Sequence, residues 1–360
     1  MVELLSSVTY EPALFLEIIR QGMHGKPGQN RHRLTLVLIV ATASTSWSQT
    51  PFASACAEDD HISAAKRASV NSAAQKFAQA LLGSEPATAY DLLSDGGKQD
   101  LTREQLATQM SSAVKQFEPK NIRIQHTYVV TLKGKSPGRL ICSTDLSKPT
   151  GWESVAATDV AEQAHVLLAA DARNNQLVFT LWLVPERETW KIQSFWVNVA
   201  TLADKGSEQL WELGHAEKQK GHFFNAALLY AAAAQACNRG PNFQLGLAQA
   251  ITDEVSHLSV PAEIQGQPPF TWKAADVTFS VLNVGPIAVG GMIYVMIQHE
   301  ASPWTNDSQA EALNRKLLAY FKSRFPEYSD VFAGIVARVH ERGGNRGYGT
   351  VEELSSTAKQ

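Results

Sequence analysis

The sequence predicts an α+β protein built from three segments. A helical period of apolar residues runs through residues 62–117 and a two-residue period follows it, which is the order of helices before an antiparallel sheet. Small residues over 208–238 predict two helices in close contact, and strands return after a Pro-containing linker. We therefore expect an N-terminal extension at 1–55, an α+β domain at 60–202, a helical hairpin at 205–258 and a C-terminal ββαββ domain at 268–355.

The composition is that of an ordinary globular protein and argues against nucleic acid as a partner. The 360 residues are 44% hydrophobic and 19% charged, with a formal net charge of −3. A nucleic-acid-binding protein needs a basic face to displace counterions, and the chain has no run of Lys and Arg. No Cys/His spacing resembles a zinc site, so we expect neither a metal nor another cofactor.

The first residues predict export. Arg31-His32-Arg33 precede the apolar run Leu34–Val40, and small and polar residues follow, which is the order of an export signal. The run is far shorter than the ~20 residues of a spanning helix, so we expect no transmembrane span and a periplasmic or secreted protein. The residues before the signal fit no export pattern, which makes Met23 the better initiator. The alternative is a cytoplasmic protein with a short buried strand at 34–40.

The cysteines leave two questions open. Cys56 follows Ala53-Ser54-Ala55 and is a candidate for lipidation, although Ala53 stands where lipoprotein signals usually have Leu. Cys142 and Cys237 would pair in an oxidising compartment if they met. They fall in different predicted domains, so we expect two small buried hydrophobic side chains instead.

The N-terminal domain begins with helices at 62–82, which Gly83 ends, and at 102–117, which the capping box Thr102–Gln105 opens. Strands are expected at 122–132, 139–143, 161–170, 177–184 and 190–199. The segments Ala87–Ser94, Thr102–Gln105 and Thr189–Ser194 resemble the NTF2-like (cystatin-like) family. That resemblance implies a cone, in which a bent antiparallel sheet wraps around the N-terminal helices.

Such a cone implies a pocket, used by some relatives for isomerase or dehydratase chemistry and by others for binding a small apolar ligand. The candidate pocket residues here are Tyr90, His126, Tyr128, Trp182 and Trp196. His126 alternates with apolar residues of the strand at 122–132, and a buried histidine can act as acid or base near neutral pH. Asp159 and Glu162 are the nearest candidates for the carboxylate it would need. The alternative is a core histidine with a backbone partner, and His165 is expected to face solvent.

The central hairpin carries a second resemblance. Its small and aromatic residues fall at the spacing of a tetratricopeptide repeat: Leu213, Gly214, Gly221, Phe223, Ala226, Tyr230 and Ala233. A partial second copy begins at Leu245. The resemblance implies a scaffold or a peptide-contact surface, but so few repeats form almost no groove. A spacer that braces the two α+β domains is the alternative.

The C-terminal domain resembles no family. We expect strands at 277–284, 292–299, 332–340 and 348–354 around a helix that the capping box Ser308-x-x-Glu311 opens and Pro326 ends. Polar residues at the strand ends are candidates for a ligand cleft or, more simply, for solvated positions: His299, Glu300, Trp304, Asp307, Arg338, His340 and Glu341.

These observations favour an exported, non-enzymatic binding or interaction protein with a protein or peptide partner at its hairpin. The alternative is a small-molecule enzyme or ligand-binding protein that uses the cone, with His126 as acid or base. A third possibility is an envelope component tethered through Cys56. An exposed sheet edge would also favour a homodimer.

Overall fold

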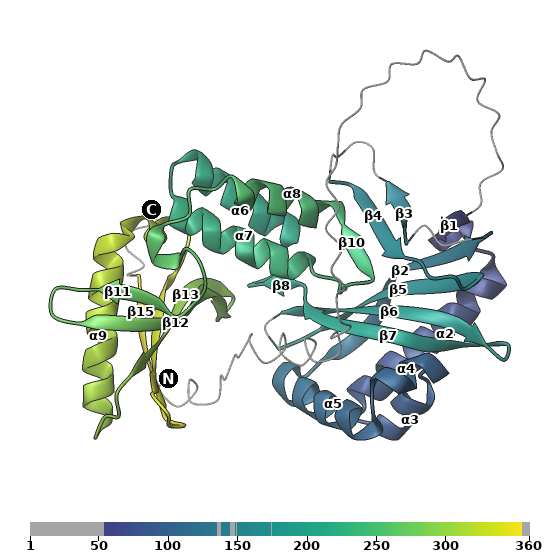
Figure 1. The fold of residues 1–360 in the computed structure, drawn as a ribbon, viewed down its shortest axis with the longest axis horizontal. Coiled ribbons are helices and arrows are strands. Elements are labelled where there is room, and N and C mark those ends of the chain that lie inside the picture. Colours follow the sequence, from purple (N-terminus) through teal and green to yellow (C-terminus); the bar gives the residue numbers. More distant parts are fainter. Residues whose placement is uncertain (1–53, 135–137, 145–147, 149, 174, 355–360) are drawn as a thin grey trace, which may run out of the picture. The chain divides into compact units, whose positions relative to one another are not determined.

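The structure is a computed structural model that describes residues 54–134, 138–144, 148, 150–173 and 175–354 (Figure 1). The predicted export signal therefore lies outside the described residues. The described residues belong to one compact unit. No helix in the described part of the chain combines the length and the apolar character that crossing a membrane requires.

The N-terminal helices form where the apolar spacing predicts them. Buried Val70, Ala74, Phe77 and Leu81 form the inner stripe of the first long helix, which ends before Gly83. The predicted capping box is confirmed, because Thr102 and Gln105 accept hydrogen bonds from each other's backbone N–H. The helices are α2 (Ala64–Leu82), α3 (Pro86–Asp91), α4 (Asp95–Asp100) and α5 (Arg103–Phe117).

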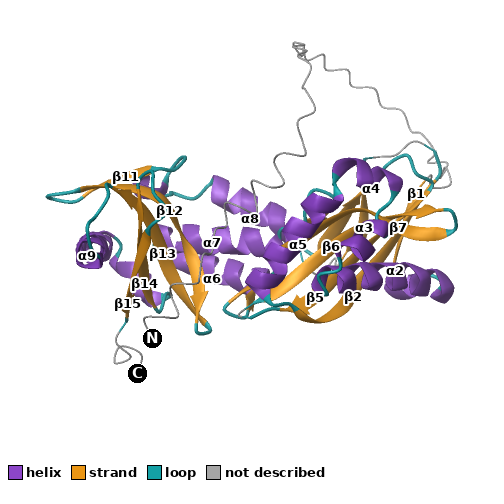
Figure 2. Ribbon diagram, turned by 90° about the horizontal axis from the view of Figure 1, so that it is seen from below, coloured by secondary structure: helices purple, strands orange, loops and turns teal. Residues whose placement is uncertain are grey.

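A five-stranded antiparallel sheet follows in the order β1-β2-β5-β6-β7, and α2 packs against one of its faces (Figure 2). A smaller sheet has the order β10-β4-β3. Three of these strands, β1, β4 and β10, were not expected from the sequence. The strands are β1 (Ser54–Glu58), β2 (Lys120–Leu132), β3 (Arg139–Thr144), β4 (Trp152–Ala156), β5 (Glu162–Asp171), β6 (Gln176–Glu186), β7 (Thr189–Val199) and β10 (Phe243–Leu245).

The alternation of residue types predicts that the apolar side chains of β2 all lie on one face of the sheet. In the structure they divide between its two faces. A β-bulge between Ile124 and His126 shifts the register against β5. Ile122 and Ile124 therefore pack in the core beneath α2, whereas Tyr128, Val130 and Leu132 pack on the opposite face. The expectation that the apolar residues of β2 share one face with His126 is wrong for this reason.

The central hairpin consists of α6 (Ser207–Gln219) and α7 (Phe223–Cys237), and Gly221 makes the turn with φ +80°. The helices approach closely at Gly214, where an added Cβ would lie 2.8 Å from the Tyr230 ring. Ala226, Tyr230 and Ala233 are fully buried, as expected. Phe223 is 36% exposed, so its predicted place in the buried stripe is wrong; neighbouring Phe224 is buried instead.

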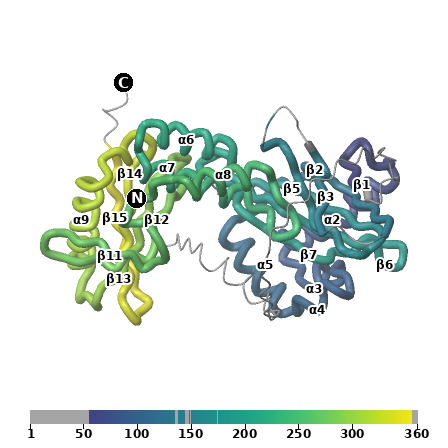
Figure 3. Tube along the Cα trace, turned by 45° about the horizontal axis from the view of Figure 1, so that its top comes forward, coloured from purple at the N-terminus to yellow at the C-terminus, as the bar shows by residue number. Residues whose placement is uncertain are grey.

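The chain then pairs β10 with β4 and continues into α8 (Gly246–Ser256). Helices α6, α7 and α8 lie side by side (Figures 1 and 3). A short two-stranded ribbon, β8 (Thr201–Leu202) with β9 (Lys205–Gly206), precedes the hairpin, and the short helix η3 (Ala262–Ile264) follows α8.

The C-terminal sheet has one strand more than the predicted ββαββ order, because Phe270–Lys273 pairs with the next strand. Its strands follow chain order, and β13 and β14 are parallel on either side of the crossover helix α9. Asn306, not Ser308, caps that helix: its side chain accepts from the backbone N–H of Gln309. The elements are β11 (Phe270–Lys273), β12 (Thr278–Val289), β13 (Met292–Ala301), α9 (Asp307–Arg324), η4 (Pro326–Asp330), β14 (Gly334–Glu341) and β15 (Gly347–Glu353).

The hairpin and the C-terminal sheet share one hydrophobic core. It joins Leu210 and Phe224 of the hairpin to Trp272, Phe321 and Ile335. The rings of Phe224 and Phe325 stack with centroids 4.2 Å apart. Most residues of α7 are buried, and its exposed residues follow one stripe of the helix: Phe223, Ala231, Ala234 and Gln235.

Candidate functional site

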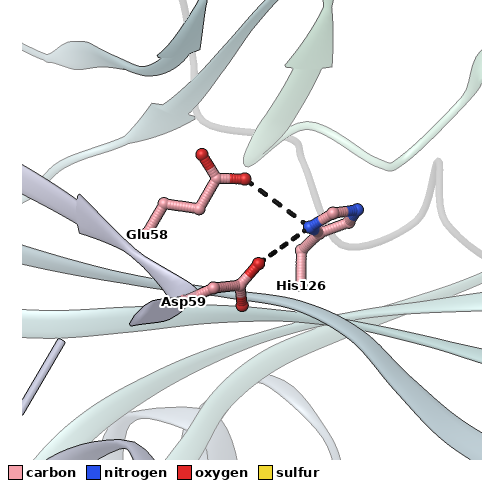
Figure 4. A group of neighbouring side chains, drawn as sticks. All are labelled: Glu58, Asp59 and His126. Atoms are coloured by element: carbon pink, nitrogen blue, oxygen red, sulfur yellow. Dashed lines mark hydrogen bonds and ion pairs between the residues drawn. The ribbon is translucent and has the colours of Figure 1, made fainter. Parts of the chain in front are cut away.

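His126 is an exposed residue that lies beside Glu58 and Asp59 (Figure 4). Its side chain is 46% exposed, and its Nδ1 lies 3.0 Å from Oδ2 of Asp59 and 3.5 Å from Oε1 of Glu58. The other ring nitrogen points away from both carboxylates. The carboxylates that meet His126 are therefore not Asp159 and Glu162; Glu162 pairs with Lys66 instead.

Local structure brings these three side chains together. Glu58 ends β1 opposite Tyr128 in the register of β2, and Asp59 begins the short helix η2 (Asp59–His61) with φ 39°. Oδ1 of Asp59 also accepts from the backbone N–H of Thr127 at 2.9 Å, which fixes the carboxylate beside the bulge. The ligand atoms of Glu58, Asp59 and His126 lie within 4.8 Å of one another, so the trio is able to hold a cation at the surface.

The five residues predicted to line a cone pocket do not meet in one cavity of the described residues. Tyr90 packs on the helix side, where Lys98 and Arg103 lie over its ring at 5.7 and 5.2 Å. His126, Tyr128, Trp182 and Trp196 belong instead to the opposite face of the sheet. A shallow groove of about 440 Å³ lies elsewhere, and none of the five lines it.

That opposite face holds a row of polar and aromatic side chains. Tyr128 is fully buried and its hydroxyl donates to Glu153; burial first, and then this carboxylate, raise the pKa of Tyr128 far above its usual range. Its cross-strand neighbour His165 is also fully buried, so the expectation that His165 faces solvent is wrong. Burial lowers the pKa of His165 to about 3, and its ring stacks on Trp182 with centroids 5.8 Å apart.

Two carboxylates organise the polar contacts of the hairpin. Glu254 of α8 accepts from Trp211 and Lys218 of α6 and from the hydroxyl of Tyr230. Glu217 is only 2% exposed and accepts from Lys220, Asn225 and, at 2.9 Å, from Nδ1 of His222. Burial alone would raise the pKa of Glu217, but these hydrogen bonds outweigh it and lower the pKa.

The Glu217 cluster joins the hairpin to the C-terminal sheet. Asn225 donates to the backbone oxygen of Glu327 at 2.7 Å, and Nδ1 of His222 lies 3.5 Å from Asp330. Glu217, His222 and Asp330 form the second trio whose ligand atoms lie within 4.8 Å of one another. Lys220 already neutralises Glu217, so the cluster serves to attach the turn of the hairpin to η4.

The cysteines pair differently from either expectation. Cys56 of β1 and Cys142 of β3 form a disulfide, while Cys237 is a buried free thiol whose pKa burial raises. A sulfur atom in a disulfide cannot also carry the thioether of a lipoprotein, so lipidation at Cys56 does not fit this bonded form. Cys237 lies in the apolar interior, as expected. Cys142 is only partly buried and is bonded to Cys56.

The polar strand ends of the C-terminal sheet divide between the interior and the surface. His299 is buried and its Nε2 lies 2.8 Å from Oδ1 of Asn314, whereas Glu300 pairs with Arg342 at the surface. Arg346 lies over the ring of Trp304 at 5.1 Å. These side chains fasten strands and helix to one another.

No protein-family model matches the chain, and no curated protein is similar to it.

Proposed function

We propose that the protein is an exported, non-enzymatic binding protein whose α6–α7 hairpin is a brace between two α+β units. The observation that carries this proposal is that the buried apolar residues of α7 belong to one core with the C-terminal sheet. Helix α7 packs against the C-terminal sheet through this core and also contacts β7, so the hairpin touches both α+β units. Asn198 of β7 donates to the backbone oxygen of Asn238, just beyond α7, at 3.0 Å.

The two family resemblances are part of the proposal. The close approach of Gly214 to Tyr230 supports a tetratricopeptide-like helix pair. Helices that pack on one face of an antiparallel sheet support an NTF2-like N-terminal domain.

The bracing role is tested with two neighbouring phenylalanines. Phe224→Ala removes a fully buried ring that contacts Phe321 and Phe325, at a cost of about 3–5 kcal/mol, whereas Phe223→Ala removes a half-exposed one. Hydrogen exchange measured by mass spectrometry should rise in α9 and β12–β14 of the Phe224 variant and stay unchanged in the control. Faster exchange confined to α6 and α7 would refute the brace.

Export is supported by the disulfide, since disulfides persist in oxidising compartments and are rare in the cytosol. In cells of the source organism, the protein should be found in the periplasmic or secreted fraction. There, an alkylating reagent added without reductant should leave Cys56 and Cys142 unlabelled. Complete labelling of both thiols in native cell extract would contradict export.

The enzymatic alternative rests on one observation, the Asp59 carboxylate on Nδ1 of His126, which orients the ring as a general base requires. It predicts hydrolysis of an activated ester such as p-nitrophenyl acetate that His126→Gln and Asp59→Asn both abolish. His257→Gln, which removes another exposed histidine, is the matched control. Equal rates in all variants would leave the binding proposal standing.

A further inference from the structure

Four buried polar atoms that have no hydrogen-bond partner among the described residues gather on one face of the five-stranded sheet. They are Nδ1 of His165, Oγ1 of Thr180, and Nε1 of Trp182 and Trp196. His165 and Thr180 are 0% and 4% exposed. Buried polar side-chain atoms are hydrogen-bonded in the large majority of proteins, so this concentration requires an explanation.

The register of the strands places these side chains next to one another. His165 of β5 pairs with Trp182 of β6, and Thr180 of β6 pairs with Trp196 of β7. Positions 180 and 182 point to the same face because side chains alternate along a strand. Directly paired residues of an antiparallel sheet have Cβ atoms about 5 Å apart, so the four groups belong to one small patch.

A second layer covers this patch. Nε2 of His165 lies 3.0 Å from the backbone oxygen of Ala156 in β4. Asn242 donates to Ser194 of β7 at 2.9 Å, and Gly240 lies so close to Trp196 that an added Cβ would be 2.7 Å from the ring. The patch therefore lies between the two sheets, on the face opposite α2.

The chemistry of the patch is that of an acceptor-binding site. The carbonyl of Ala156 accepts from Nε2 of His165, which leaves Nδ1 as an acceptor in the neutral ring. The two indoles offer N–H donors and Thr180 offers a hydroxyl. Two arginines of the covering layer, Arg139 and Arg239, donate to backbone oxygens and form no salt bridge within the part of the chain that the structure describes. The negative charge of Glu153 also acts on Arg239.

We propose that this patch binds a small organic carboxylate that carries a hydroxyl group. Its carboxylate oxygens accept from the indole N–H groups of Trp182 and Trp196 and from Thr180, and its hydroxyl donates to Nδ1 of His165. The arginines of the cover supply positive charge. This inference rests on the proposed binding function and assigns it a ligand class and a place in the fold.

The test uses the full-length oxidised protein and two probes, glycolate and formate, at constant ionic strength set with sodium chloride. The indole N–H resonances of Trp182 and Trp196 should shift and saturate with each probe, and glycolate should bind more tightly. Trp272 is the internal control, because its Nε1 already donates to the backbone oxygen of Glu263 at 2.7 Å.

Variants separate the roles of the patch. Trp196→Phe and Thr180→Val each remove one donor and should weaken glycolate binding on the order of tenfold. His165→Gln keeps a donor for Ala156 but lacks the Nδ1 acceptor, so formate should bind as before while the preference for glycolate disappears. Unchanged Trp272 resonances show that each variant is folded.

Three results would overturn this inference: no shift with either probe, as expected if the patch holds ordered water only; equal shifts of all indole resonances; or unchanged affinity in all variants. None of them affects the tests of the brace and of export, which use hydrogen exchange and thiol labelling.

Discussion

Gly214→Ala tests the close approach of the two hairpin helices. The new Cβ would lie 2.8 Å from Cδ1 and Cε1 of Tyr230 and 3.4 Å from Cβ of Leu229. Tyr230 is fully buried and its hydroxyl is held by Glu254, so its ring has little freedom to move away. Overpacking of this kind costs about 1–3 kcal/mol, while replacing glycine by alanine inside a helix returns about 1 kcal/mol. We expect a net loss of about 1 kcal/mol in the free energy of unfolding.

Urea unfolding followed by tryptophan fluorescence measures this change. Ala216→Gly at an exposed position of the same helix supplies the helix-propensity contribution alone. In a Tyr230→Leu background the ring is absent, and Gly214→Ala should become neutral or stabilising. A stabilisation of about 1 kcal/mol in both backgrounds would refute the steric argument, because only helix propensity would then act.

Three further predictions concern the disulfide and two buried titratable groups. Replacing Cys56 and Cys142 by Ser should lower the free energy of unfolding by about 2–4 kcal/mol, since the bridge spans 86 residues; dithiothreitol should destabilise the wild type equally and leave the variant unaffected. His165 binds its proton near pH 3 when folded and near pH 6.5 when unfolded, so stability falls as the pH drops through this window. The fall should be about 1.4 kcal/mol per pH unit steeper than in His165→Gln, and parallel urea midpoints would contradict it. Glu217→Gln should cost about 1–3 kcal/mol at pH 7, and because the folded pKa of Glu217 is lowered, that cost should shrink as the pH falls below 4.5; thermal unfolding at pH 7 and pH 3 checks both.

Local chemistry explains what the sequence predicted correctly. The capping box at Thr102 and the helix end before Pro326 depend on residues within a few positions of one another, and the small-residue contact of Gly214 with Tyr230 joins two helices across one short turn. The α+β character and most strands follow from apolar periodicity for the same reason. The NTF2-like and tetratricopeptide-like families remain predictions.

Long-range register explains what the sequence did not predict. The bulge before His126 places Tyr128, Val130 and Leu132 on the face opposite Ile122 and Ile124, and no residue type in the strand marks that shift. Strand β1 forms because Cys56 and Glu58 find partners in β3 and β2, which lie more than 60 residues further on. Because β1 was not predicted, Asp59 was not recognised as the partner of His126, although the acidic run from Glu58 to Asp60 was a visible signal.

The interior shared by α7 and the C-terminal sheet limits how this chain can be divided. A recombination event that exchanged the sheet but kept the hairpin would leave Phe224 without the rings of Phe321 and Phe325. A break in the linker near Pro268 would separate Trp272 from the helices it packs with. Although the segments look like independent modules in the sequence, hairpin and sheet should be inherited, expressed and engineered as a single piece.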